Sequence, residues 1–74
     1  MKIVNQIKTL IINSDKYDIG IHEFDIVAFD IRNERERLVL GTYPLEEQVQ
    51  LEFDTIVSCM KQGMPVYQMS PVFP

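Results

Sequence analysis

The chain has 74 residues, a formal net charge of −4, 46% hydrophobic residues and one cysteine. This length predicts a single domain covering residues 1–74, and so small a domain buries only about 60% of its unfolded surface, so we expect a marginally stable monomer or an oligomer. A single cysteine excludes an internal disulfide and a cysteine-only zinc site, which fits a reducing cytoplasm. The acidic balance argues against direct nucleic-acid binding. Because no signal peptide and no apolar run of membrane length is seen, we expect a cytoplasmic protein with no membrane contact.

The first thirteen residues are compatible with two structures. Four apolar side chains would line one side of a helix: Ile3, Ile7, Leu10 and Ile11. The β-branched residues that dominate this stretch favour strands instead, in a hairpin with strands at Lys2–Asn5 and Thr9–Asn13 around Gln6–Lys8. Periodicity alone does not decide between the two. Residues 13–15, Asn-Ser-Asp, then predict a turn, because their side chains bond to nearby backbone groups.

Alternation predicts two strands between residues 17 and 31. Their apolar faces are Tyr17, Ile19 and Ile21 in the first strand and Val27, Phe29 and Ile31 in the second. Asn33–Glu36 is expected to form a hairpin loop. Pairing across this loop sets three residues opposite three others: Ile31 with Leu38, Phe29 with Leu40, and Val27 with Thr42. These pairs share one face, which needs a cover.

The segment Leu45–Gly63 has the clearest periodicity in the chain. At about 100° per residue, one arc collects the apolar side chains Leu45, Val49, Phe53, Ile56, Val57 and Met60, with Cys59 at its edge. Pro44 suits the first helical turn, and Gly63 suits the left-handed position after the last turn. Leu51 points away from the apolar arc, either as an isolated exposed leucine or as a contact with a partner.

Residues 64–74 read MPVYQMSPVFP. Pro65 and Pro71 exclude a central strand, which leaves an edge strand near Val66–Met69 or an extended arm. The apolar side chains of this arm either fold back over the core or contact a second subunit. In the second case the contact residues would be Val66, Tyr67, Met69, Val72 and Phe73.

Together these elements predict an α+β fold. An antiparallel meander of four to five short strands in residues 1–43 forms one small sheet. A single C-terminal amphipathic helix in residues 44–63 covers one face of this sheet, and the extended arm of residues 64–74 follows it. Such a layer offers little concavity for an active site.

Several short stretches resemble a loose class of small uncharacterised proteins encoded by phages and mobile elements of Gram-positive bacteria. The stretches are KIVNQ, LIIN, DIVAFDI, LVLGTYPLEEQ and VYQM. Members of this class open with a short strand and place a Leu-Gly-x-Tyr strand end before a helix that begins with paired glutamates, the positions that Leu40–Tyr43 and Glu46–Glu47 hold here. The sequence departs from the class at Pro44–Leu45, where a polar cap is usual, and at Gln48, where arginine is common. The resemblance implies a strand at the N-terminus, and the class has no established activity that could be carried over.

Few residues could carry chemistry. His22 and Cys59 are the only residues of their kinds, and a Cys–His nucleophile pair requires them to touch, whereas the predicted faces place them on opposite sides of the sheet. Glu23, Asp25 and Asp30 would have to converge in a cleft to bind a metal or act as acid and base. The predicted strands spread them over a surface instead. We therefore expect no enzymatic activity, no metal and no cofactor.

The acidic face of the predicted helix is the remaining candidate. Glu46, Glu47 and Asp54, together with Leu51, could meet a basic surface on another protein. This predicts a non-enzymatic protein-binding accessory or inhibitory factor, of phage or mobile-element origin by the resemblance. The alternative is a self-associating structural component, such as a homodimer, that uses the C-terminal arm.

Overall fold

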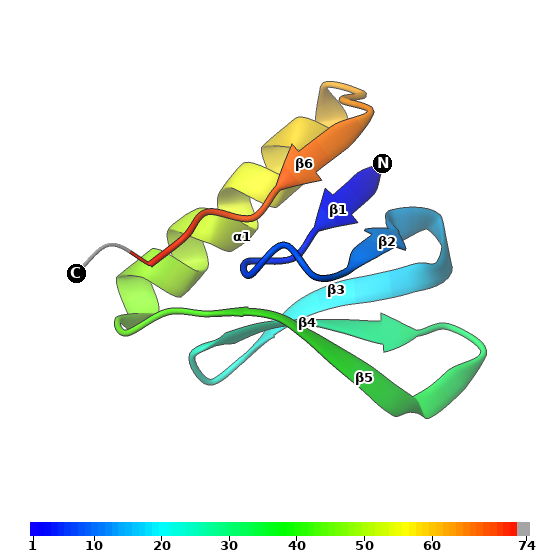
Figure 1. Cartoon of the computed structure of the whole chain (residues 1–74), viewed down its shortest axis with the longest axis horizontal. Coiled ribbons are helices and arrows are strands. Elements are labelled where there is room, and N and C mark those ends of the chain that lie inside the picture. The colour runs from blue at the N-terminus through cyan, green and yellow to red at the C-terminus, as the bar shows by residue number, and fades with distance from the viewer. Residues whose placement is uncertain (73–74) are drawn as a thin grey trace.

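The computed structural model describes residues 1–72, with residues 34 and 35 described only through their backbone. Over these residues the elements are β1 (Lys2–Val4), β2 (Ile11–Asn13), the 3₁₀ helix η1 (Ser14–Lys16), β3 (Tyr17–His22), β4 (Asp25–Asp30), β5 (Asn33–Thr42), α1 (Glu46–Lys61) and β6 (Val66–Gln68). The strands form a first sheet, ordered β2-β1-β6, and a second sheet, ordered β3-β4-β5 (Figure 1). The predicted α+β class is confirmed, but the prediction of one sheet is wrong. The helix also lies mid-chain, because β6 follows it.

The chain changes sheets at η1. The Asn13 side chain accepts a hydrogen bond from the Asp15 N–H at 3.1 Å, and this bond starts the 3₁₀ turn that redirects the chain from β2 into β3. The turn predicted at residues 13–15 is therefore confirmed. Because β3 leaves η1 in a new direction, it pairs with β4 instead of extending the first sheet.

The N-terminal stretch is a hairpin, as the strand alternative predicted, with Ile3 opposite Ile12. Buried Asn5 closes its loop, because the Asn5 Oδ1 accepts hydrogen bonds from the Thr9 and Leu10 N–H groups at 2.8 and 3.0 Å. After the helix, β6 pairs with β1 in parallel, placing Tyr67 opposite Ile3. Of the two alternatives for this segment, the structure has the edge strand, at Val66–Gln68, and the expectation of purely antiparallel pairing is wrong.

The second sheet corrects the predicted register. β4 and β5 are joined by a two-residue turn at Ile31 and Arg32, not by a loop at Asn33–Glu36. The Asp30 carboxylate accepts a hydrogen bond from the Arg32 N–H at 2.8 Å and so begins the turn early. Ile31 consequently lies in the turn with 55% of its surface exposed.

The earlier turn exchanges the two faces of β4. Ala28, opposite Leu38, now faces the core together with Ile26, and both are fully buried. Val27 and Phe29 lie on the other face, opposite Val39 and Arg37, although Val27 is also buried there, at 1% exposed. A one-residue shift inverts a whole strand. The three predicted pairs across this hairpin are therefore all wrong.

Helix α1 is shorter than predicted at both ends. Leu45 is the extended residue that precedes it, with φ −126°, so Pro44 lies before the helix and not in its first turn. At the other end Gly63 has φ +70°, and the N–H groups of Gly63 and Met64 donate to the carbonyls of Met60 and Cys59, each at 3.1 Å. This Schellman arrangement confirms the predicted role of Gly63.

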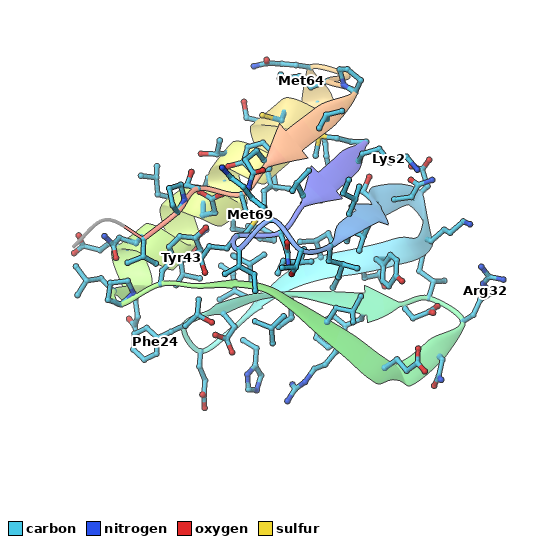
Figure 2. All side chains as sticks on the ribbon, in the orientation of Figure 1. Lys2, Phe24, Arg32, Tyr43, Met64 and Met69 are labelled. Atoms are coloured by element: carbon cyan, nitrogen blue, oxygen red, sulfur yellow. The ribbon has the colours of Figure 1, made fainter. Side chains whose placement is uncertain are left out.

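The core lies where the two sheets and α1 meet. Its buried hydrophobic residues are Ile3, Ile12, Ile26, Ala28, Leu40, Tyr43, Val49, Ile56 and Met69. Gln6 ties the sheets together, because its side chain exchanges two hydrogen bonds of 3.0 Å with the backbone of Thr42 at the end of β5. Figure 2 shows Met69 directed into the interior between the elements and Tyr43 beside it.

Candidate functional site

One exposed surface of α1 combines acidic residues with an exposed leucine. Glu46, Glu47, Leu51 and Asp54 are all exposed, and we call them the acidic helix surface. Leu51 is 68% exposed. It lies one helical turn from both Glu47 and Asp54, so a carboxylate flanks it on each side. The structure thus brings together the four residues that the sequence predicted as a partner-binding site.

A small cleft lies next to this surface. It has a volume of about 180 Å³ and is lined by Tyr43, Gln48, Leu51, Glu52, Ser70, Pro71 and Val72. Leu51 forms part of its wall, and Val72, which is 45% exposed, forms another part. The cleft can take a small apolar group but is far below the usual size of a small-molecule site.

Buried Glu52 was not predicted as a special residue. It is only 5% exposed, and one carboxylate oxygen accepts hydrogen bonds from the Tyr67 hydroxyl at 2.6 Å and the Ser70 N–H at 2.9 Å. The Tyr43 hydroxyl donates to the Ser70 carbonyl at 2.7 Å. Burial raises the pKa of both tyrosines above the ordinary 10.0, and the Glu52 carboxylate raises it further. This cluster fixes the segment after β6 against α1.

The residues predicted to contact a second subunit are distributed over different environments. Met69 is fully buried in the core of its own chain, and Tyr67 is half-buried with its hydroxyl on Glu52. A buried side chain offers no surface to another copy. Val66 and Val72 are exposed at 52% and 45%, and Phe73 lies outside the described residues.

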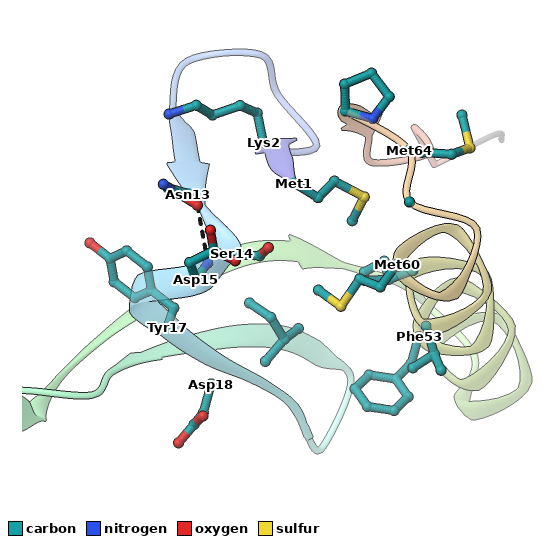
Figure 3. Close-up of a pocket in the computed structure, with 15 residues that line it drawn as sticks. Met1, Lys2, Asn13, Ser14, Asp15, Tyr17, Asp18, Phe53, Met60 and Met64 are labelled. Carbon is teal, nitrogen blue, oxygen red and sulfur yellow. Dashed lines mark hydrogen bonds between the residues drawn. The ribbon is translucent and has the colours of Figure 1, made fainter.

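A larger groove runs between the C-terminal half of α1 and β3. It is open to solvent, has a volume of about 700 Å³, and is lined by Met1, Lys2, Asn13, Ser14, Asp15, Tyr17, Asp18, Ile19, Phe53, Ile56, Val57, Met60, Gly63, Met64 and Pro65. In Figure 3, Phe53 and Met60 reach from α1 toward β3, and Met1 lies above them. The sequence predicted little concavity in this fold, and this groove corrects that expectation. A helix crossing two separate sheets leaves a gap at the seam between them.

The other candidate residues do not come together. His22 pairs with Asp25 on the outer face of the second sheet, whereas Cys59 belongs to α1 on its inner side. Asp25 accepts a hydrogen bond from the Thr42 hydroxyl at 2.7 Å on this outer face, and Asp30, five residues along the same strand, lies on the opposite face. Within the described part of the chain, no cluster of His, Cys, Asp and Glu could hold a metal ion.

Within residues 1–72, α1 is too short and too polar to span a bilayer. The chain was also compared with known proteins at three levels. Neither family models, nor curated proteins, nor solved structures give a match. A functional assignment therefore depends on the chemistry of the surfaces themselves.

Proposed function

We propose that this chain is a non-enzymatic protein-binding factor that docks a basic surface of a partner protein on its acidic helix surface. The observation that carries the proposal is Leu51, which is 68% exposed between two carboxylates and beside a cleft of about 180 Å³. A lone leucine contributes little to folding when it is so exposed. An apolar centre within a charged rim is the usual anatomy of a protein interface.

The charge distribution favours a basic partner. From residue 38 to the end of the chain the sequence has four acidic residues and one basic residue, Lys61. Lys61 lies in the last turn of α1, away from Glu46 and Glu47 in the first turn. The acidic charge is therefore not balanced locally, and it would steer a positively charged partner toward α1. An accessory or inhibitory role in a phage or mobile element is the setting that the sequence resemblance suggests.

Affinity capture from an extract of the source cells tests this proposal. The wild-type chain should retain a partner that the double variant E47K/D54K loses, because the variant repels a basic surface. The matched control E23K/E36K makes the same change in net charge at exposed residues away from α1 and should retain the partner. L51A should weaken capture without changing charge. Identical sets of captured proteins for wild type and E47K/D54K would refute the proposal.

Self-association through the C-terminal arm is the second candidate function. The exposed Val66 and Val72 are the arm residues that could still contact another copy. Light scattering over a range of concentrations distinguishes the two functions. A single monomeric mass at all concentrations would exclude the homodimer and leave the protein-binding role.

A further inference from the structure

Strand β3 has an unpaired main-chain edge. Over residues 1–72 it pairs only with β4, at one side of the second sheet. The Ile31 N–H donates to the Lys16 carbonyl at 3.3 Å, so Lys16 and, by alternation, Asp18 direct their backbone groups toward β4. Ile19 and Ile21 therefore direct their N–H and C=O groups to the other side. Among the described residues, no backbone or side-chain group bonds to these four groups of Ile19 and Ile21.

This edge forms one wall of the groove of about 700 Å³. Tyr17, Asp18 and Ile19 line the groove from β3, and Phe53 and Met60 line it from α1. Figure 3 shows Tyr17 and Asp18 on one side of the groove and Phe53 and Met60 on the other. The wall opposite β3 is apolar and flexible, because methionine adapts its shape to different neighbours.

Two of the other edge strands carry features that limit further pairing. β6 has only three residues and lies between Pro65 and Pro71, which cannot donate to a further strand. The end of β5 is covered by Gln6, which bonds to Thr42. Proteins usually block exposed edges in such ways. An open edge beside an apolar wall is the arrangement that accepts an additional strand from a partner.

The charges indicate which strand would fit. A segment added beside β3 would alternate its side chains between the inner face, where Phe53 and Met60 lie, and the outer face, where Asp18 is exposed. In Figure 3, Asp18 points away from Phe53 and Met60. A basic side chain on the outer face would thus sit across from Asp18. Lys2, which also lines the groove, belongs to β1 of the other sheet.

We propose that the groove binds an extended peptide segment of a partner protein, which adds a strand to the free edge of β3. Apolar residues of the peptide alternate with basic ones. The apolar residues pack on Phe53 and Met60, and the basic residues face Asp18. This site is separate from the acidic helix surface, so the test of peptide binding in the groove does not depend on the proposed function.

A displayed library of random decapeptides, selected on the full chain, provides the probe. Enriched peptides should alternate apolar and basic residues, and binding should slow hydrogen exchange at the Ile19 amide, which faces the groove. N-methylation of every second peptide residue can be placed on either of two alternate sets. Methylating the residues whose N–H groups face β3 should abolish binding, and methylating those whose N–H groups face solvent should leave binding unchanged.

Two variants of the chain test the side-chain contacts. M60E introduces a charge into the apolar wall, and D18K reverses the charge of an exposed residue, so D18K remains informative if M60E does not fold. Each should weaken the enriched peptides by about tenfold or more. L51E, at a 68% exposed position outside the groove, should not weaken them. The proposal is overturned if no peptide is enriched, or if the enriched peptides bind D18K and wild type equally. It is also overturned if the Ile19 amide becomes protected at high protein concentration without peptide, because that would indicate a second copy in the groove.

Discussion

Glu52 holds the segment after β6 through hydrogen bonds to the Tyr67 hydroxyl and the Ser70 N–H. In E52A both donors lose their acceptor in a site where Glu52 itself is 5% exposed. An unsatisfied buried donor costs about 1–3 kcal/mol, so urea unfolding should show a loss of stability of about this size. E52Q keeps an acceptor oxygen and should lose less. D54A, at an exposed position on the same helix, should stay within about 0.5 kcal/mol of wild type. Equal stability of E52A and D54A would contradict this role.

The same cluster predicts sensitivity to alkaline pH. The folded-state pKa values of Tyr43 and Tyr67 lie above the ordinary 10.0, first because of burial and then because of Glu52. The stabilisation from these protonated hydroxyls is complete below about pH 10 and is lost as pH rises through the folded-state pKa values. Urea midpoints should therefore fall as pH rises above about 10. Y67F removes one titrating hydroxyl and should make the decline shallower. A wild-type midpoint that is flat from about pH 9 to pH 12 would be inconsistent with the linkage.

At the residue scale, the sequence predicted exposure better than burial. Helical periodicity alone places Glu47 and Asp54 on the exposed side of α1, and they are exposed. Glu52 could not be found in this way, because a glutamate on a helix is normally solvent-exposed. Its burial depends on Tyr67 and Ser70, whose contact with α1 is set by the pairing of β6 with β1. No local pattern contains that information.

Among the elements, the C-terminus of α1 gives the most direct test. Gly63 has φ +70°, a conformation that L-residues rarely adopt, and a methyl group placed there would meet no atom within 4 Å. G63A should therefore destabilise through backbone conformation alone, by about 1 kcal/mol. Gly20 is the matched control, because its added methyl group would make only ordinary contact with Phe29 at 3.7 Å and its φ is not in the left-handed range. Thermal unfolding should show a lower Tm for G63A than for G20A. The reverse order would contradict the role of Gly63 in ending the helix.

Strand β4 explains why some elements were predicted correctly and others were not. The presence of β3, β4 and α1 follows from composition and periodicity, whereas the hairpin of β1 and β2 was one of two alternatives that periodicity left open. Within β4, however, residues 26–29 are Ile-Val-Ala-Phe, an uninterrupted apolar run whose two faces look alike in the sequence. The Asp30 carboxylate starts the turn at Ile31, and the pairing with β3 sets Ile26 and Ala28 opposite Ile21 and Ile19. These longer-range pairings, which the run itself does not contain, place Ile26 and Ala28 in the core.

For the molecule as a whole, the two-sheet architecture depends on contacts between distant residues. β6 pairs with β1 across most of the chain, with Lys2 opposite Val66. The groove beside β3 exists because the two sheets separate at η1, so its presence could not be inferred from any one segment. The residues that line the groove are visible in the sequence, but their proximity in the fold is not. By contrast, the acidic helix surface is contained in one element, and for that reason it could be predicted.

The C-terminal segment provides the prediction that tests this architecture. Met69 is fully buried between the sheets and α1, and its N–H donates to the Val4 carbonyl at 2.9 Å. M69A leaves a cavity in the core and should lower the free energy of unfolding by about 2–5 kcal/mol. V66A, at a 52% exposed position of β6, should change it by no more than about 0.5 kcal/mol.

The concentration dependence of these variants distinguishes packing within one chain from packing between two. If Met69 fills its own core, the stability loss in M69A is the same at every protein concentration, because unfolding is unimolecular. If the segment instead packed on a second copy, stability would rise with protein concentration in the wild type, and M69A would remove that rise. Urea unfolding at two concentrations about a hundredfold apart is sufficient, because a dimer would then gain about 2.7 kcal/mol. A wild-type midpoint that moves between these concentrations, with no such movement in M69A, would refute the fold of the C-terminal segment onto its own chain.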